Sequence, residues 1–390
     1  MAEAFVDIPP IPPNLSADDR LRIDHQRLRR DLLYGRAESH VEARIERNIG
    51  GVRREAWGHV DLTAAPFLDL ATEASHLYDT EPEVRAPEGS LELIEAVANV
   101  GYWPLMQRIQ RDTFGLREML VRVDAEGLEE PLPSGVPISF RPVFPDMTQV
   151  TAHPRWPSIP VRVQEIKRHR DLGWVRHDLS IEDASHPWYR VWSTSGADVT
   201  RDVLDVPSFE GRTYAYRDGE GRPILPYGIY HAAETGWIFD PWTLRPVVEG
   251  SINVCVLLTF YGHLIRNAAW AQRYAVNLEP VGMEVEQDLA ARTRRTVVTD
   301  PATLLCLRVI DGDLPSSTGQ WVSPADPEAV LRSIAAYERR MTMSAGFAPR
   351  DVTRQEADIR SGYSLAVDRE AARERQAVFR PQFERGDRGI

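Results

Sequence analysis

Cysteine and lysine are almost missing from this sequence of 390 residues. The two cysteines, Cys255 and Cys306, exclude a disulfide framework and a cysteine-based zinc site. We expect two buried, reduced thiols, with a single bridge as the alternative. The only lysine, Lys167, does not follow a glycine, which excludes a phosphate-binding loop. The same count argues against a kinase-type or Ser-x-x-Lys site.

Long hydrophobic runs are also lacking. The most apolar run, Ile252–Ile265, is shorter than the roughly 20 residues that a membrane span needs, and it contains His263. The N-terminus, Met1–Asn14, is acidic and proline-rich and has no signal-peptide pattern. These features predict a soluble intracellular protein with no membrane partner.

Positive charge is in deficit, because the formal net charge is -12. A protein that grips phosphates over a broad basic face is therefore excluded. The apolar content of 43% and charged content of 27% are those of a folded protein. The 29 prolines favour many short segments and loops over one smooth helical bundle.

The histidines show no metal-binding spacing. His231 and Glu234 lack a nearby third ligand, and His263 is expected to be a hydrogen-bonded core residue. Gly219-Glu220-Gly221 is followed by a proline-started strand instead of a helix, so it is not a dinucleotide loop. No Gly-x-Ser-x-Gly elbow occurs. The sequence predicts no metal and no cofactor.

One pattern is typical of an enzyme. Pro145-Asp146 followed by Glu165-Ile166-Lys167 matches the Pro-Asp…(Asp/Glu)-x-Lys layout of metal-dependent nucleases. There, two carboxylates would hold Mg²⁺ and the lysine would orient the attacking water. Prolines such as Pro154, Pro157 and Pro160 interrupt the expected strands. We therefore expect a solvated strand with paired charges, and the nuclease is the alternative.

The N-terminal part reads as helical. Two polar helices are expected within Leu15–Asn48, with Ser16 as the N-cap of the first. A short buried helix is expected over Phe67–Tyr78. A longer amphipathic helix is expected over Leu91–Thr113, and Pro104 should kink or break it.

After Gly115 the spacing of the apolar residues changes from helical to alternating. Met119–Asp124 is expected to be a strand, and Trp174–Tyr230 a β-rich stretch. Within it, Thr213–Ile229 reads as a hairpin with Asp218-Gly219 at the turn.

A long helix is expected from Glu249 to about Ala275, roughly 40 Å in length. Its first turns are apolar on nearly every side, so they must be covered by the rest of the chain or by other copies. We expect six of its residues to make the packing contacts: Ile252, Val256, Leu257, Phe260, Tyr261 and Leu264.

The remainder of the chain alternates short elements and loops. A charged helix is expected over Glu284–Arg295 and a strand over Leu304–Ile310. Asp326-Pro327-Glu328 is a strong helix start, and Gly346 is the natural stop. A polar loop and a charged helix over Gly362–Gln382 then follow.

Four short phrases, in this order and spacing, resemble the portal proteins of tailed bacteriophages. Leu77–Val84 is similar to the phrase that closes the helical part of a portal wing. Pro223–Tyr227 resembles the strand before the first stem helix, and Ala329–Gly346 the returning stem helix. Ser361–Leu365 resembles the Ser-Gly-x-Ala-Leu phrase beside the tunnel loop, with Ser364 in place of the alanine.

The resemblance implies an α+β portal-like fold in which the C-terminal crown is absent or minimal. Its parts would be a helical and β-rich wing (1–248), a first stem helix (249–276), a small α/β clip (277–325), a second stem helix (326–346), a tunnel loop (347–361) and a C-terminal wing helix (362–390).

The resemblance also implies a non-enzymatic function. Portal proteins form a homo-oligomeric ring, usually a dodecamer, through which double-stranded DNA is packaged and ejected. The implied partners are the major capsid protein, the terminase and a head–tail adaptor, and the implied location is the virion, with the host cytoplasm during assembly. Arg350, Arg354 and Arg360 would face DNA from the tunnel loop. The main rival is another head–tail connector or minor capsid protein.

Overall fold

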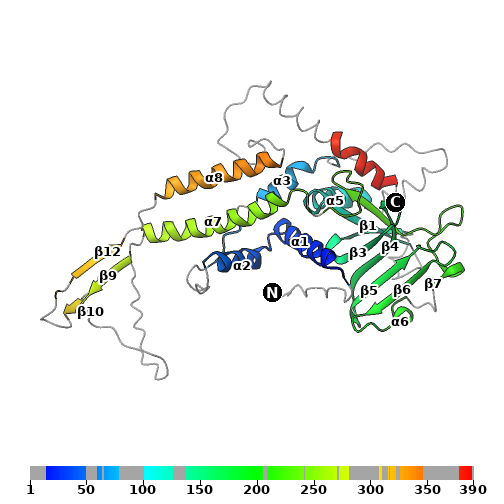
Figure 1. Cartoon of the computed structure of the whole chain (residues 1–390), viewed down its shortest axis with the longest axis horizontal. Coiled ribbons are helices and arrows are strands. Elements are labelled where there is room, and N and C mark those ends of the chain that lie inside the picture. The colour runs from blue at the N-terminus through cyan, green and yellow to red at the C-terminus, as the bar shows by residue number, and fades with distance from the viewer. Residues whose placement is uncertain are drawn as a thin grey trace. The chain divides into compact units, whose positions relative to one another are not determined.

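The structure, a computed structural model, describes residues 15–49, 59–63, 66–78, 101–125, 138–204, 209–240, 242–269, 272–280, 307–309, 315, 317–321, 326–345 and 377–388. Over these residues the chain is mixed α+β with antiparallel sheets, as the sequence predicts (Figure 1). It divides into two compact units. Unit 1 comprises Met1–His40, Ala65–Ile252 and Arg339–Ile390, and unit 2 comprises Val41–Ala64 and Asn253–Glu338.

The two N-terminal helices are confirmed. Helix α1 spans Ala17–Leu33 and helix α2 spans Glu38–Ile49. The Ser16 hydroxyl accepts a hydrogen bond from the backbone N–H of Asp19 at 3.0 Å, so it caps α1 as expected. Local sequence was sufficient here because a cap and its partner lie within one turn.

Helices α3 (Pro66–Ala74) and α5 (Tyr102–Leu116) follow. The prediction of one helix over Leu91–Thr113 is wrong, because Gly101 precedes α5 with a φ of 79° and a left-handed residue interrupts any helix there. Pro104 consequently lies in the first turn of α5, where its missing N–H leaves no hydrogen bond unmade.

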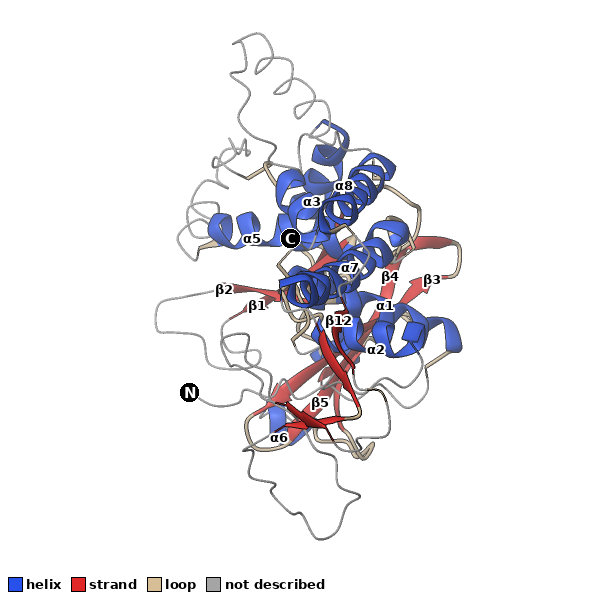
Figure 2. Cartoon of the chain, turned by 90° about the vertical axis from the view of Figure 1, so that its left-hand side faces the viewer, coloured by secondary structure: helices blue, strands red, loops and turns tan. Residues whose placement is uncertain are grey.

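Unit 1 contains a three-stranded and a five-stranded antiparallel sheet, whose strands are red in Figure 2. Their strand orders are β2-β1-β8 and β3-β4-β5-β6-β7. The strands are β1 (Glu118–Ala125), β2 (Ile138–Val143), β3 (Thr148–His153), β4 (Trp156–His169), β5 (Gly173–Ser180), β6 (Trp188–Ser193), β7 (Phe209–Glu210) and β8 (Tyr227–His231). The short helices are η2 (Pro145–Met147), α6 (Thr200–Leu204) and η3 (Gly211–Thr213).

One hydrophobic core joins the two sheets. Leu120 and Val143 of the three-stranded sheet belong to the same buried cluster as Val163, Leu179 and Val191 of the five-stranded sheet. Alternate residues of each strand therefore point toward the other sheet, as expected for antiparallel sheets with one buried face.

The expected hairpin Thr213–Ile229 is only partly formed. Arg217 and Pro223 make a single bridge around the Asp218-Gly219 turn. The returning strand, β8, pairs with β1 in the register Arg122↔Tyr227. A partner about a hundred residues away in the sequence thus replaces the local one, and Tyr227 and Tyr230 of the paired strand are buried.

The long helix, α7, spans Arg245–Ala269, so the predicted boundaries of 249–276 are shifted. Leu244 has a φ of 61° and ends the preceding loop, and Pro246 occupies the first turn, where proline is tolerated. At the other end, Gln272–Val276 forms strand β9 instead of continuing the helix.

In unit 2, β9 pairs antiparallel with β12 (Ser317–Trp321), and β10 (Leu278–Pro280) pairs with β11 (Leu307–Val309). Strand β11 lies within the predicted strand Leu304–Ile310. The expected helix Glu284–Arg295 lies outside the described residues.

Helix α8 spans Pro327–Ser344, and the Asp326 carboxylate accepts a hydrogen bond from the N–H of Glu328. The predicted start of this helix is therefore confirmed. Residues 377–388 are helical, within the expected C-terminal segment 362–390. Residues 347–361, the expected tunnel loop, lie outside the described residues.

Candidate functional site

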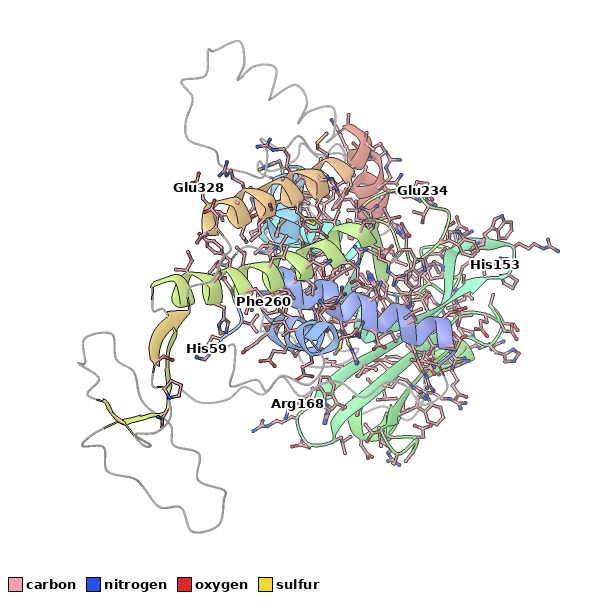
Figure 3. The ribbon with its side chains drawn as sticks, turned by 60° about the vertical axis from the view of Figure 1, so that its left-hand side comes forward. His59, His153, Arg168, Glu234, Phe260 and Glu328 are labelled. Atoms are coloured by element: carbon pink, nitrogen blue, oxygen red, sulfur yellow. The ribbon has the colours of Figure 1, made fainter. Side chains whose placement is uncertain are left out.

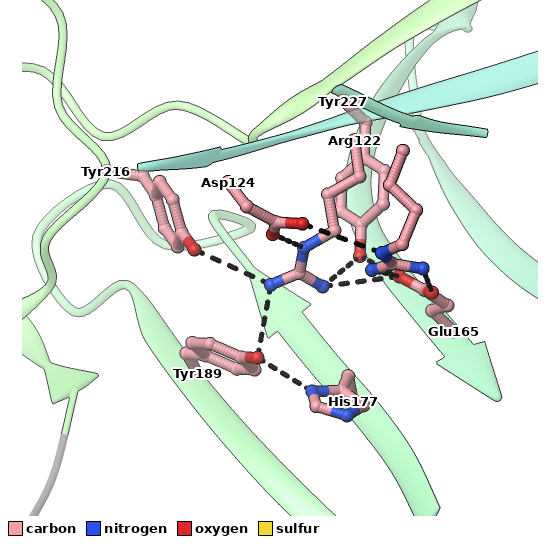
Figure 4. Close-up of polar contacts among 8 residues, drawn as sticks. Arg122, Asp124, Glu165, His177, Tyr189, Tyr216 and Tyr227 are labelled. Atoms are coloured by element: carbon pink, nitrogen blue, oxygen red, sulfur yellow. Dashed lines mark hydrogen bonds and ion pairs between the residues drawn. The ribbon is translucent and has the colours of Figure 1, made fainter. Parts of the chain in front are cut away.

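A buried arginine, Arg122, lies between the two sheets of unit 1 (Figure 4). Its side chain is fully buried and comes from β1, where it lies between Val121 and Val123. The guanidinium donates to the hydroxyl of Tyr227 at 2.7 Å, to Asp124 at 2.9 Å and to the hydroxyl of Tyr189 at 3.1 Å. Every branch of the guanidinium is therefore hydrogen-bonded, which a buried charge requires.

Glu165 of β4 is the buried anion of this cluster. Its carboxylate accepts hydrogen bonds from Arg122 at 3.2 Å, from both Nη groups of Arg141, and from the hydroxyl of Tyr227 at 2.9 Å. Burial opposes its ionisation, but Arg141 and Arg122 outweigh burial and hold the pKa of Glu165 far below its ordinary value. Both carboxylate oxygens are already occupied, so Glu165 is a poor ligand for a metal ion.

His177 and the tyrosines complete the cluster. The Nδ1 atom of His177 lies 2.7 Å from the hydroxyl of Tyr189. Burial and the nearby Arg122 lower the pKa of His177 well below its ordinary value, so the ring is neutral at pH 7. Burial raises the pKa values of Tyr189 and Tyr227. The cluster therefore holds no group that is ready to exchange a proton near neutral pH.

The residues of the nuclease pattern fall into two separate ion-pair clusters. Asp146 lies in η2, where its carboxylate contacts Arg30 at 2.9 Å and Arg27 at 3.9 Å. Burial raises the pKa of Asp146 in spite of these arginines. The two carboxylates thus bind arginines from different elements instead of facing one shared cation. Among the described residues, no group of three or more histidine, cysteine, aspartate or glutamate side chains could hold a metal ion.

Sequence reasoning did not identify Arg122 or a second polar cluster around Asp387. The carboxylate of Asp387 accepts hydrogen bonds from three hydroxyls, those of Tyr78 at 2.8 Å, Tyr102 at 2.7 Å and Tyr230 at 2.9 Å. This contact anchors the helix at 377–388 to the body of unit 1. An arginine in the apolar run Met119–Val123 is the signal that could have identified the first cluster. No local signal points to the second one.

The residues expected to pack the long helix differ in burial. Ile252 and Val256 are buried, with exposed fractions of 1% and 5%, whereas Leu257 is 38% exposed. Phe260, Tyr261 and Leu264 are partly buried. The helix is therefore covered on one side and open on the other within the chain.

Unit 2 carries a second set of exposed aliphatic side chains. Ile265 of α7 is 41% exposed and Leu331 of α8 is 44% exposed. Phe260 lies on α7 and Glu328 at the start of α8 (Figure 3). Asn253 of α7 contacts the hydroxyl of Tyr337 of α8 at 3.4 Å, so the two helices meet through a polar contact as well.

Helix α7 also meets a simple test for a membrane span, since Arg245–Ile265 is long and apolar enough. The core helix of a soluble protein meets the same test, and 44% of the most apolar window is buried within the chain. Cys255, in the middle of this window, is buried, and burial raises the pKa of its thiol to about 11. The second cysteine, Cys306, lies outside the described residues.

The three arginines expected to face DNA, Arg350, Arg354 and Arg360, also lie outside the described residues. No protein-family model matches this chain, and no curated protein matches its sequence.

Proposed function

We propose that this chain is the subunit of a bacteriophage portal, a ring at the capsid vertex through which double-stranded DNA passes. The observation that carries the proposal is the order of elements in the second half of the chain. A long helix, α7, leads directly into β9, and the partner strand β12 precedes the long helix α8. This is the order of stem helix, clip and returning stem helix.

The pairing of β9 with β12 supports this order. The register runs from Ser317↔Val276 to Trp321↔Gln272, so the outgoing and the returning segments are antiparallel neighbours. The β10–β11 pair, Leu278–Pro280 with Leu307–Val309, therefore belongs to an excursion of the chain that begins after β9 and ends before β12. A clip is an excursion of this kind, and it would dock the terminase and later the head–tail adaptor.

The exposed aliphatic residues of α7 and α8 support assembly into a ring. Leu257, Ile265 and Leu331 are each more than one-third exposed, although each is large and apolar. Covering a large apolar side chain that is exposed to water is favourable. In the proposed ring, the neighbouring copies of the chain would cover them.

The mechanism of such a ring is passive and needs neither a metal nor a cofactor. The acidic balance of the chain, -12 per copy, disfavours tight pairing with DNA phosphates. Arg350, Arg354 and Arg360 of the segment 347–361 would then supply the local contacts that retain DNA.

Electron microscopy of the purified full chain tests the proposal. We expect cone-shaped rings of about a dozen subunits with a central channel. Leu257→Asp should give folded protein without rings, and Glu220→Lys, an exposed change outside the two helices, should leave the rings intact. A protein that stays monomeric at every concentration would contradict the portal and equally the rival head–tail connector.

A nuclease assay addresses the remaining alternative. The intact protein should show no Mg²⁺-dependent cleavage of DNA, because Asp146 and Glu165 are held by arginines. Cleavage that is lost on Lys167→Ala would replace the portal proposal with the nuclease.

A further inference from the structure

The hairpin of β3 and β4 extends beyond the rest of the five-stranded sheet. Strand β5 pairs with β4 from Arg162 to His169, whereas β4 itself begins at Trp156. Residues 151–160 therefore form a two-stranded ribbon at the edge of the described sheet, and we call them the β3–β4 arm. None of the residues from 151 to 160 is buried. Figure 3 shows His153 at the outer end of this arm.

The β3–β4 arm carries exposed apolar side chains. Trp156 is 54% exposed and Ile159 is 46% exposed. The ring of His153 stacks on that of Trp156, with 4.6 Å between the two ring centroids. Covering apolar surface is favourable, and a two-stranded ribbon by itself is only marginally stable in water. A partner that covers the arm would therefore stabilise it.

Prolines limit the ways in which the arm can bind. Pro154 lies in the turn, and Pro157 and Pro160 lie in the β4 part of the arm. A proline has no backbone N–H, so it cannot donate a hydrogen bond to a further strand. The prolines thus disfavour the addition of a strand alongside β4 and leave the side chains as the binding groups. They also fix backbone angles, which lowers the entropy lost on binding.

A surface with complementary features lies at the N-terminal half of α1. Leu21 is 52% exposed, and the exposed residues Asp18 and Asp24 lie three positions before and after it, on the same side of the helix. One turn after Leu21, the ring of His25 packs edge-on against Trp242, which is 42% exposed. We call Leu21, Trp242 and the two aspartates the α1 patch.

The arm and the α1 patch are complementary in charge. Arg155 is exposed beside Trp156, and the segment 148–164 contains no acidic residue. The patch has two carboxylates around an apolar centre, and the arm has a guanidinium beside one. The guanidinium of Arg245 lies 5.5 Å from the ring centroid of Trp242, so the patch is basic on that side. The arginine of the arm is therefore expected on the side of the aspartates.

Trp156 and Leu21 are each more than half exposed, so they do not cover one another within one chain. We propose that the β3–β4 arm of one copy docks on the α1 patch of the next copy. Trp156 and Ile159 pack on the apolar part of the patch, and Arg155 pairs with one of its aspartates. The two surfaces differ, so the contact is head-to-tail, and such a contact repeated with a closing rotation produces a ring. The inference rests on the proposed ring and adds a second interface to it.

Cross-linking of the full chain tests the contact. The double variant Arg155→Cys/Asp24→Cys, treated with a short bis-maleimide reagent, should give a ladder of dimers, trimers and larger species on a denaturing gel. A ladder is expected because each copy carries one thiol of each of two junctions. Arg155→Cys/Glu220→Cys, whose second thiol lies at an exposed site outside the patch, should give no ladder. The two single variants, which retain Cys255 and Cys306, should give none either.

Two matched substitutions measure the contribution of the arm to assembly. Ile159→Asp places a charge in the apolar contact, so it should raise the protein concentration at half assembly about tenfold or more in sedimentation experiments. Ile224→Asp changes another isoleucine, which is 42% exposed, and should change that concentration less than about twofold. Circular dichroism checks that each variant is folded.

Rings seen by electron microscopy without the cross-linked ladder would overturn this inference and leave the proposed ring in place. An equal ladder with Arg155→Cys/Glu220→Cys would indicate random collision, and a cross-linked product that stays monomeric would place both surfaces in contact within one chain. Either result would overturn the docking, as would equal effects of Ile159→Asp and Ile224→Asp. The absence of any assembly would contradict the proposed function together with this inference.

Discussion

The cluster around Arg122 and the helix pair α7–α8 each contain residues in an unfavourable environment, buried charges in the first and exposed apolar side chains in the second. In the cluster, buried charges that would be costly alone are matched by partners from the same chain. In the helix pair, large apolar residues such as Leu257 and Leu331 are left partly exposed. The charges of the first region are paired within the chain, whereas the second leaves large apolar side chains partly exposed.

The contrast shows where burial alone misleads. A run of apolar residues in α7 suggests a fully covered helix, yet adjacent positions such as Val256 and Leu257 differ from 5% to 38% in exposure. A carboxylate in a nuclease-like pattern suggests an open site, yet Glu165 is fully paired. The type of a residue indicates which neighbours it needs, and the fold decides whether the chain provides them.

The largest loss of stability is expected for Glu165→Leu, which removes the buried carboxylate of the Arg122 cluster. It leaves Arg122 and Arg141 without their buried counter-ion, and removal of one partner of a buried pair costs about 3–5 kcal/mol. Urea denaturation should show this loss in the free energy of unfolding. Glu220→Leu, at an exposed ion pair, should cost less than about 1 kcal/mol. Equal effects of the two changes would contradict the structural role of the cluster.

The next largest effect is expected in α7, where two adjacent substitutions compare a buried position with a partly exposed one. Val256→Asp places a charge at a buried position and should lower the free energy of unfolding by about 3 kcal/mol or more. Leu257→Asp, one residue further along, should lower it by less than about 1 kcal/mol, because Leu257 is partly exposed. Thermal denaturation at low protein concentration separates this effect from assembly. The reverse order of the two effects would show that α7 is covered on the opposite side.

The pH dependence of stability tests whether His177 of the Arg122 cluster is neutral in the folded state. Because the pKa of His177 is lowered in the folded state, below about pH 6.5 the unfolded state binds a proton that the folded state does not. Stability should therefore fall as the pH falls from 6.5. His177→Gln should reduce this slope by about 1.4 kcal/mol per pH unit. An unchanged slope in His177→Gln would show that this ring is protonated in the folded state.

The smallest effect is expected for Asn253→Ala in the helix pair. Asn253 accepts a hydrogen bond from Arg44 at 3.1 Å and donates one to Tyr337 at 3.4 Å, in a partly solvated setting. Its removal should cost about 1 kcal/mol in chemical denaturation. A loss as large as that of Glu165→Leu would mean that the helix pair depends on a polar core too.

Elements with local signals were predicted well. The cap at Ser16, the start of α8 at Asp326 and the strand within Met119–Asp124 were each expected from neighbouring residues, and each is present. The boundaries of α7 were not. Gln272–Val276 can continue a helix or form a strand, and its pairing with β12, more than 40 residues later, decides the outcome.

The candidate site was predicted less well than the fold. The pattern containing Asp146 and Glu165 was recognised, but its arginine partners are unpredictable from spacing. Arg30 comes from α1, Arg122 from β1 and Arg141 from β2. The same holds for Asp387, whose three tyrosines lie 157 to 309 residues away.

The sequence by itself determined where helices begin at a cap, that Met119–Asp124 is a strand, and that the chain is acidic and mixed α+β. Only the tertiary structure decided which strands pair, which side of α7 is open, and which charges meet in the core. The physical reason is the range of the interactions. Helix hydrogen bonds and caps join residues within about four positions, whereas ladder partners and buried ion pairs form between distant segments that only the folded chain brings together.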